Sequence, residues 1–133
     1  MILLDTSVLI DFLKGKDNTK VRLFETILDQ KIPWGICEYV FQEVLQGARD
    51  DKEFNRLREY LDSVPIFGLK YGKTSFEKAA LLHYQCRRAG ITIRSSIDVL
   101  IAEITIEHGG YLLHNDTDFD HMAGIIKALK VVT

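Results

Sequence analysis

The sequence predicts an α/β fold in which helices cover both faces of a parallel sheet. Two observations support this class. Short apolar runs alternate along the chain with longer segments of helical periodicity, and apolar strands joined through helices are typical of a sheet that is buried on both faces. No repeat, low-complexity tract or linker interrupts the 133 residues. We therefore expect one domain with one core, residues 1–133.

Five short apolar runs are the strand candidates. Pro33 opens the second of them. In chain order, the expected strands are residues 1–4, 32–37, 65–69, 111–114 and 129–133. In open α/β sheets, ligands bind beyond the carboxyl ends of the strands. Polar residues that directly follow these runs are therefore the first place to look for a site.

Six segments carry the signals of helices. Ser, Thr or Asp residues stand near the start of several of them, and Gly15, Gly47 and Gly90 stand where three of the patterns end. In chain order, the expected helices are residues 5–15, 18–31, 38–48, 51–64, 74–90 and 95–110. No helix is predicted between the last two strands.

The composition is that of an ordinary globular protein, with 47% hydrophobic and 27% charged residues. The formal net charge of −2 gives no global positive field, so any binding of nucleic acid must rely on a local patch. No apolar run approaches the roughly 20 residues of a membrane span, and the N-terminal run contains Asp5 and Asp11 without a basic leader. Cys37 and Cys86 lie in apolar segments and are interpreted as reduced, buried thiols. We expect a cytoplasmic protein without a membrane segment.

Three aspartates follow the fourth strand candidate at every second position: Asp116, Asp118 and Asp120. Alternating aspartates also open the calcium-binding loop of EF-hand proteins. That loop needs Gly at its sixth position and Glu at its twelfth, where this chain has His121 and Lys127. The segment is therefore not an EF-hand, and its acids must be balanced in another way.

Two of the acids stand at predicted strand ends. Asp5 directly follows the first strand, where a helix N-cap is the alternative interpretation. Asp116 stands shortly after the fourth strand, where it could also be a turn residue. Asp118 is the better ligand candidate of the remaining two, because it lies two residues from Asp116 and can face the same pocket. Asp120 is expected in a turn or at a helix start.

Two further acids lie in apolar helical segments. Asp98 falls in the first turns of a helix among Ile and Val residues, and Glu43 shares a helical face with Val40 and Val44. A first-turn acid is also stabilised by the helix dipole, so a structural role is open for Asp98. An acid on an apolar face otherwise needs a partner. Oxygen ligands of this kind suit Mg²⁺ or Mn²⁺, whereas the four scattered histidines offer no zinc site.

Four motifs in order carry a resemblance to a known family: "MILLDTSVLIDFL", "EYVFQEVLQGA", "SSIDVLIAE" and "YLLHNDTDF". They combine a strand followed by an aspartate and two hydroxyls, a glutamate four residues before a glycine, an aspartate before an apolar run, and a strand followed by Asp-x-Asp-Phe. The chain resembles the PIN-domain nucleases, and most closely the VapC-like toxins of toxin–antitoxin pairs.

The resemblance implies a three-layer α/β/α fold and a divalent-metal-dependent ribonuclease that hydrolyses RNA phosphodiester bonds. It implies an acidic pocket of Asp5, Glu43, Asp98 and Asp116, with Asp118 as an auxiliary ligand, that binds Mg²⁺ or alternatively Mn²⁺. It also implies a small antitoxin protein as partner and a homodimer. A PIN fold that only binds RNA or protein, without catalysis, is the alternative.

Residues around this pocket are expected to hold the substrate. Ser7, at a helix start, could orient a ligand or contact phosphate. Arg49 and Arg94 are candidates to grip the RNA backbone, with Arg87 and Arg88 as weaker ones. A carboxylate pocket attracts a guanidinium, so the antitoxin is expected to insert an Arg there. The rest of that peptide should cover apolar surface near the first helices, in the segment that contains Val8, Leu9, Phe12 and Leu13.

The chain departs from the family pattern at two positions. His114 stands where the family usually has Thr or Ser, and Glu103 stands where a small residue is more common. Glu103 is interpreted as a surface difference. A phosphatase with Asp5 as covalent nucleophile is disfavoured, because Ser7 occupies the place of the second aspartate. A receiver domain is disfavoured as well, because it needs adjacent acids after its first strand.

Overall fold

Four short parallel strands form the central sheet, in the spatial order β3-β2-β1-β4. In the computed structural model, which describes residues 1–133, they are β1 Ile2–Leu4, β2 Trp34–Cys37, β3 Ile66–Phe67 and β4 Tyr111–Leu113. Leu3 of β1 pairs with Gly35 on one side and with Leu112 on the other. The first and last strands are therefore neighbours, and their carboxyl ends lie at the same edge of the sheet.

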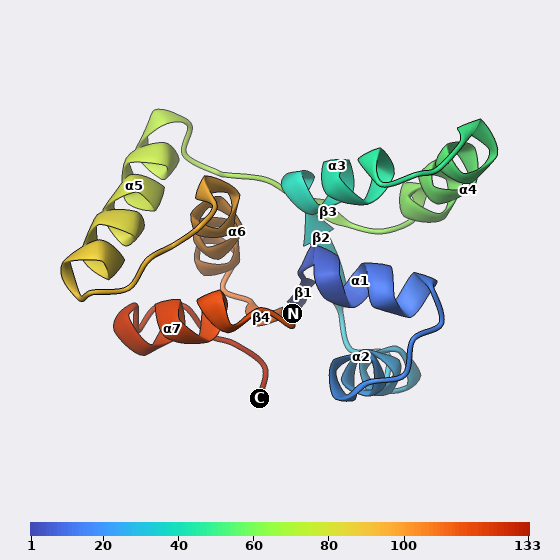
Figure 1. Cartoon of the computed structure of the whole chain (residues 1–133), viewed down its shortest axis with the longest axis horizontal. Coiled ribbons are helices and arrows are strands. Elements are labelled where there is room, and N and C mark those ends of the chain that lie inside the picture. The colour runs from blue at the N-terminus through green and yellow to red at the C-terminus, as the bar shows by residue number, and fades with distance from the viewer.

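Seven helices cover the sheet: α1 Thr6–Leu13, α2 Thr19–Asp29, α3 Glu38–Gln46, α4 Asp51–Asp62, α5 Lys73–Arg88, α6 Ser96–Glu107 and α7 Thr117–Ile125. In Figure 1, α5, α6 and α7 lie on one side of the strands and α1 to α4 on the other. Contacts within each set agree with this view, because α5 packs against α6 and α7, while α1 packs against α2 and α3. The predicted three-layer α/β/α fold is confirmed.

Local sequence signals explain where several helices begin and end. The side chains of Asn18, Asp50 and Ser95 accept hydrogen bonds from backbone N–H groups in the first turns of α2, α4 and α6. Gly15 and Gly90 follow α1 and α5 with φ of +72° and +85°, a backbone conformation that glycine adopts without steric cost. The helix ends that the sequence predicts at these two glycines are confirmed.

One hydrophobic cluster of 26 buried residues joins the sheet to both helical layers. Phe24 and Phe119, the largest fully buried side chains, come from helices on opposite sides of the strands. Full burial of such a side chain contributes about 1.5–3 kcal/mol. Cys37 and Cys86 are buried free thiols, as the sequence predicts. The helices fall short of the length and apolar character that a membrane span requires.

The fifth strand, predicted for residues 129–133, is much shorter in the structure. Only Val131 pairs with the sheet, through a single parallel bridge to Leu112. Two backbone hydrogen bonds of 2.9 Å flank this bridge, from Leu112 N to Lys130 O and from Val132 N to Leu112 O. The tail thus follows β4 for one residue pair, so the sheet has four full strands.

Helix α7 is absent from the sequence prediction. Its apolar face consists of Phe119 and Met122, both fully buried, and Ile126 directly after it is also buried. The side chain of Asp116 caps the helix by accepting a hydrogen bond from Asp118 N. Spacing and cap are both present in the sequence, but the three alternating aspartates conceal them. Asp118 and Asp120 lie in the first turn of this helix, and a helix start is one of the two settings that the sequence predicts for Asp120.

Candidate metal centre

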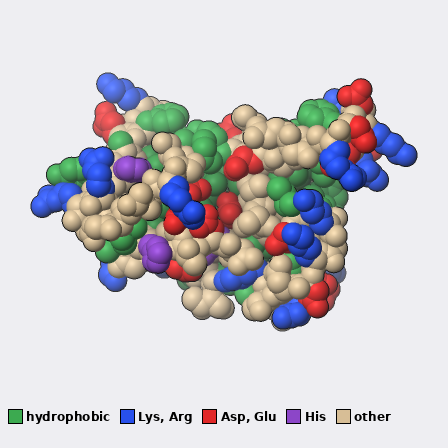
Figure 2. All heavy atoms as spheres, in the orientation of Figure 1, with side chains coloured by type: hydrophobic (Ala, Val, Ile, Leu, Met, Phe, Trp, Pro, Cys, Tyr) green, Lys and Arg blue, Asp and Glu red, His purple; other side chains and the backbone are tan.

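The carboxyl ends of the neighbouring strands β1 and β4 bring two segments distant in sequence together. Asp5 directly follows β1, and its backbone N–H donates a 2.9 Å hydrogen bond to the carbonyl of Leu113 at the end of β4. Asp116 follows three residues after Leu113, as the N-cap of α7. Figure 2 shows acidic side chains gathered near the middle of one face of the molecule. The strand order therefore places the acids where parallel sheets bind ligands.

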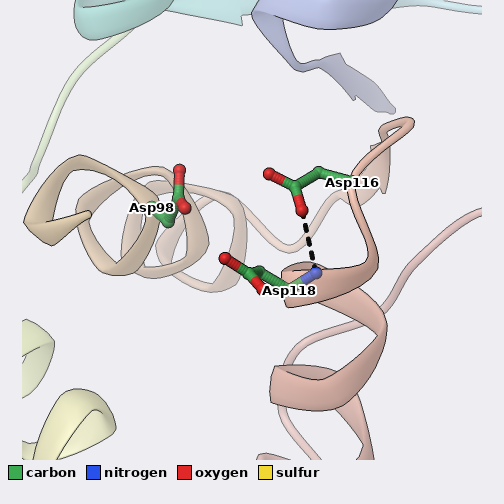
Figure 3. Close-up of side chains that lie close together, drawn as sticks. All are labelled: Asp98, Asp116 and Asp118. Atoms are coloured by element: carbon green, nitrogen blue, oxygen red, sulfur yellow. Dashed lines mark hydrogen bonds between the residues drawn. The ribbon is translucent and has the colours of Figure 1, made fainter. Parts of the chain in front are cut away.

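Three aspartates converge from two helix starts. Asp98 lies in the first turn of α6, Asp116 caps α7, and Asp118 lies in the first turn of α7. One carboxylate oxygen from each lies within 4.8 Å of the others. Figure 3 shows the three side chains pointing toward one another across the gap between α6 and α7. Asp118 N also donates a 2.9 Å hydrogen bond to Asp116 Oδ1, which fixes the turn between them.

Two hydroxyl groups orient the remaining acids. Ser7 Oγ donates a 3.0 Å hydrogen bond to Asp5 Oδ2, and Thr6 Oγ1 donates one of 3.0 Å to Glu43 Oε1. Asp5 is buried, with 7% of its surface exposed. Ser7 thus contacts the Asp5 carboxylate, and its role in orienting a ligand or contacting phosphate stays a prediction. Thr6 was not among the predicted site residues, although it stands between Asp5 and Ser7 in the same motif.

The charges of four acids, Asp5, Asp116, Asp118 and Glu43, act on the fifth acid, Asp98. The pKa of Asp98 is raised to about 7, first by burial and then by the charges of Asp5, Asp116, Asp118 and Glu43. Burial also raises the pKa of Asp5, despite the hydrogen bond from Ser7. No hydrogen bond lowers the pKa of Asp98. The protein itself leaves negative charge unbalanced here, and a cation would balance it.

One basic side chain lies against the cluster. Arg94 Nε is 3.0 Å from Asp118 Oδ2, and its Nη2 is 3.7 Å from Asp116 Oδ1. The hydrogen bond to Asp118 is the main reason that the pKa of Arg94 is raised. Its side chain is 71% exposed, so solvent screens these ion pairs. A single exposed guanidinium cannot neutralise five acids.

Comparison with known proteins supports the same assignment. The family model for the PIN domain matches residues 2–125. The chain belongs to the PIN-domain family. Over 126 residues it is 32% identical to the VapC ribonuclease Mb1587 of Mycobacterium bovis and to the ribonuclease VapC11 of Mycobacterium tuberculosis. These matches cover 94% of this chain and 93% of each relative.

Solved structures share the fold. VapBC2 from Rickettsia felis, bound to a DNA fragment from its promoter, has a TM-score of 0.76 at 18% identity and covers 99% of this chain and 98% of its own. A toxin–antitoxin complex from Klebsiella pneumoniae has a TM-score of 0.72 at 22% identity, with coverage of 100% and 97%. At these identities the likeness shows the PIN fold alone.

The donor set of this PIN domain fits a hard divalent cation. All the converging side chains offer carboxylate oxygens, the ligands that Mg²⁺ and Mn²⁺ prefer. One carboxylate oxygen from each of Asp98, Asp116 and Asp118 lies within 4.8 Å of the others, so small side-chain movements would bring all three onto one cation. No histidine belongs to this group of converging ligand atoms. Its composition therefore disfavours Zn²⁺.

Arg49, the other predicted RNA contact, lies elsewhere. Its Nε and Nη2 are 2.9 and 2.8 Å from Glu53 Oε2. It lines a groove between α1, α3 and α4 to which none of the five acids contributes. Arg87 and Arg88 lie in the last turn of α5, near the ring of Tyr84. Of the predicted basic contacts, the structure brings Arg94 alone into contact with the acids.

The interpretation of Glu103 as a surface residue is wrong. Only 3% of its surface is exposed, and burial raises its pKa to about 7. Helix α6 lies between the sheet and α5, so most residues of its second half are buried, Ile104 and Thr105 included. At position 103, therefore, α6 has no side that faces solvent. A helix with apolar residues nearly all round already indicates this in the sequence.

Proposed function

We propose that this PIN domain is a ribonuclease that hydrolyses RNA phosphodiester bonds with Mg²⁺, or alternatively Mn²⁺. The observation that carries the proposal is the cluster of carboxylates around Asp98, where burial first and the neighbouring charges second raise the pKa of Asp98 to about 7. The ribonuclease names of the relatives with 32% identity give the substrate class. A soluble phosphate ester would be the substrate of the disfavoured phosphatase alternative.

The acids of this chain would hold the cation and position the reacting groups. Asp98, Asp116 and Asp118 offer three oxygens within 4.8 Å of one another. Asp5 and Glu43, held by Ser7 and Thr6, add negative charge that acts on Asp98. A bound divalent cation neutralises phosphate charge, makes water more acidic and stabilises the leaving oxygen. The hydrogen-bonded hydroxyls restrict the Asp5 and Glu43 carboxylates to one orientation, which lowers the cost of ordering them on binding.

Basic side chains must offset the repulsion between this centre and RNA. The net charge is −2, so no general attraction is available. We propose that Arg94, exposed at the rim of the cluster, contacts a phosphate next to the cleaved bond. We further propose that Arg49, which is 82% exposed, contacts the backbone farther away. Both contacts should be sensitive to salt and insensitive to base sequence.

The chain is proposed to act as the toxin of a toxin–antitoxin pair, as a homodimer in the cytoplasm. The similar solved structures include toxin–antitoxin complexes, and the acidic centre is suited to receive an Arg from an inhibitory peptide. The groove between α1, α3 and α4 is lined by Ile10, Leu13 and Leu57 beside Arg49 and Arg56. It offers apolar surface to an amphipathic segment.

Two of the residues in the segment that the sequence suggested for this contact are unavailable. Val8 and Leu9 are fully buried in the core. Leu13 lines the groove instead, and Phe12 packs edge-on against Phe24. The proposed peptide therefore contacts the end of α1 rather than its start. Co-expression with the neighbouring small reading frame tests this partner, with relief of toxicity and a purified complex as the expected results.

The test of the main proposal is cleavage of a defined RNA set with Mg²⁺, Mn²⁺, Ca²⁺ or a chelator. Cleavage should require Mg²⁺ or Mn²⁺ and stop with the chelator. The Asp98→Asn variant is the control for a contaminating nuclease, because it should be inactive with either metal. RNA binding without cleavage under every condition would favour the alternative, a non-catalytic PIN-fold module. The cluster of Asp98, Asp116 and Asp118, with the charges of Asp5 and Glu43 also acting on Asp98, supports catalysis over that alternative.

A further inference from the structure

His114 directly follows β4 and is 1% exposed. Its ring lies 5.1 Å from the ring of Phe119 of α7. The residue therefore fills space between the end of the sheet and α7, two residues before the acid that caps α7. This position is a departure from the family pattern, and the proposed function assigns it no role.

The hydrogen bonds of the His114 ring identify its tautomer. Asp116 N donates a 3.1 Å hydrogen bond to His114 Nδ1, so this nitrogen carries a lone pair and no proton. The proton of the neutral ring is then on Nε2. Nε2 lies 3.3 Å from Asp120 Oδ1, but it is poorly aligned for a hydrogen bond and remains buried without a partner. The ring thus accepts from the backbone on one side and faces α7 with its N–H.

We propose that His114 is a positioning residue that holds Asp116 and Asp118 in the orientation in which both face Asp98. The turn between β4 and α7 is tied at two successive points. His114 Nδ1 accepts from the amide of Asp116, and Asp116 Oδ1 accepts from the amide of Asp118 at 2.9 Å. The first bond fixes the backbone of the capping acid, and the second fixes its side chain relative to the next ligand.

This inference rests on the proposed metal-dependent function, because its consequence is metal affinity. Metal ligands depend on the groups that orient them, and loss of such a group typically weakens metal binding about 10- to 100-fold. A histidine that merely fills the core would act differently. Its replacement would change metal affinity only in proportion to the loss of folding stability.

Two substitutions separate a positioning role from a space-filling role, because one keeps the hydrogen-bond acceptor and loses volume, while the other keeps volume and loses the acceptor. His114→Asn keeps an acceptor, since Asn Oδ1 is as many bonds from the backbone as His Nδ1, but leaves a cavity. His114→Leu fills the space and removes the acceptor. We expect the Leu variant to melt at a temperature at least as high as the Asn variant, since it retains more apolar packing.

The affinity for Mn²⁺ should follow the opposite order to the melting temperatures, so that the Asn variant binds Mn²⁺ more tightly than the Leu variant. It is measured from free Mn²⁺ by electron paramagnetic resonance. We expect the Asn variant to stay within about threefold of the unchanged protein and the Leu variant to lose about 10-fold or more. The tautomer is read independently of metal from ¹⁵N chemical shifts of the imidazole in the unchanged protein. These should show the proton on Nε2.

Each other outcome overturns the inference in a distinguishable way. Equal Mn²⁺ affinity in the two variants, or affinity that follows their melting temperatures, would show a structural role only. A proton on Nδ1 would remove the hydrogen bond on which the inference depends. Failure of the unchanged protein to bind Mn²⁺ would refute the proposed function, and the inference with it.

Discussion

Helix α6 carries two acids whose pKa values are raised by burial, but the groups around them balance their charge in different ways. Asp98 lies in its first turn and Glu103 farther along. Each has a pKa raised to about 7, with burial as the largest cause. At neutral pH each therefore lies near the midpoint between its charged and neutral forms. The two differ in their neighbours.

Glu103 has a partner that can share its proton. Glu107 Oε1 accepts a 2.7 Å hydrogen bond from Lys70 N, and its Oε2 is buried. A protonated Glu103 supplies an O–H to this pair. Although burial raises the pKa of Glu107, the hydrogen bonds from Glu103 and from Lys70 N lower it below its ordinary value. Lys78 adds a positive charge nearby. A single proton shared by Glu103 and Glu107 therefore removes the repulsion between these two carboxyl groups.

Asp98 has no such solution within the protein. Four carboxylates surround it, no hydrogen bond lowers its pKa, and the nearest cation, Arg94, contacts Asp116 and Asp118 instead. The comparison shows that a raised pKa alone does not mark a functional site. Such a shift indicates function where neighbouring groups leave charge that only an external cation can balance. Neutral, isosteric variants of the two acids can test this difference.

The largest expected effect is on catalysis. Asp98→Asn should reduce RNA cleavage at least about 1000-fold, because charge stabilisation by the cation contributes several kcal/mol to the transition state. Glu103→Gln should retain cleavage within a few-fold, since the amide can replace the O–H donated to Glu107. Rates are compared on one RNA at saturating Mg²⁺. An active Asp98→Asn variant would refute the assignment of the metal centre.

The same assay ranks the other acids. The variants Asp5→Asn, Asp116→Asn and Glu43→Gln should also abolish cleavage. Asp118→Asn should be milder, because Arg94 already balances part of this charge. A loss at Asp118 as severe as that at Asp98 would show that the ranking of the ligands is wrong.

The next effect is on stability. Mg²⁺ or Mn²⁺ at 100 times its dissociation constant should stabilise the fold by about 2.7 kcal/mol, because a ligand that binds the native state raises stability by mass action. The melting temperature of Glu103→Gln should rise by the same amount as that of the unchanged protein. That of Asp98→Asn should not respond to metal. An equal response in all three proteins would place metal binding outside this cluster.

A smaller effect concerns pH in the absence of metal. Both pKa values are raised, from 3.8 for Asp98 and from 4.5 for Glu103, to about 7. Between these unfolded-state values and about pH 7, the folded state binds more protons than the unfolded state. The free energy of unfolding is therefore highest below pH 3.8 to 4.5 and falls as the pH rises to about 7. Each neutral variant should melt progressively higher than the unchanged protein between pH 5 and pH 7.

Metal separates the two acids in this experiment. Saturating Mn²⁺ should remove the pH-dependent advantage of Asp98→Asn, because the cation then balances the Asp98 charge in the unchanged protein. The advantage of Glu103→Gln should persist, since Glu103 lies outside the cluster of ligand oxygens. Loss of both advantages with Mn²⁺ would show that the two acids belong to one electrostatic unit.

Much of this architecture could be predicted from the sequence, because it depends on local patterns. Apolar runs and caps identify all four strands, β1 to β4, and six of the helices, and the position of Asp5 after β1 follows from one motif. Helix α7 was missed because like charges at Asp116, Asp118 and Asp120 conceal its Phe119 and Met122 face. The short extent of the last strand depends on a single contact with Leu112, which no local pattern encodes.

The site divides in the same way. The acids themselves are visible as polar residues at strand ends or in apolar helical segments. Ser7, the partner of Asp5, is visible in the same motif, but the pairing of Thr6 with Glu43 is not, because it joins segments 37 residues apart. Glu103 was misread because its charge suggested exposure, whereas the apolar residues nearly all round α6 indicate a buried helix, and α5 packs over it.

The smallest expected effect comes from the cation that partly balances the cluster. Arg94→Gln removes two exposed ion pairs, each contributing at most about 1 kcal/mol. The site becomes more negative, so Mn²⁺ should bind up to about fivefold more tightly. If Arg94 also contacts the RNA backbone, KM should rise and its dependence on salt should weaken, while kcat changes little. Arg94→Lys keeps the charge and should restore the salt dependence. Weaker Mn²⁺ binding in Arg94→Gln would show that Arg94 orients Asp116 and Asp118 rather than competing with the metal for them.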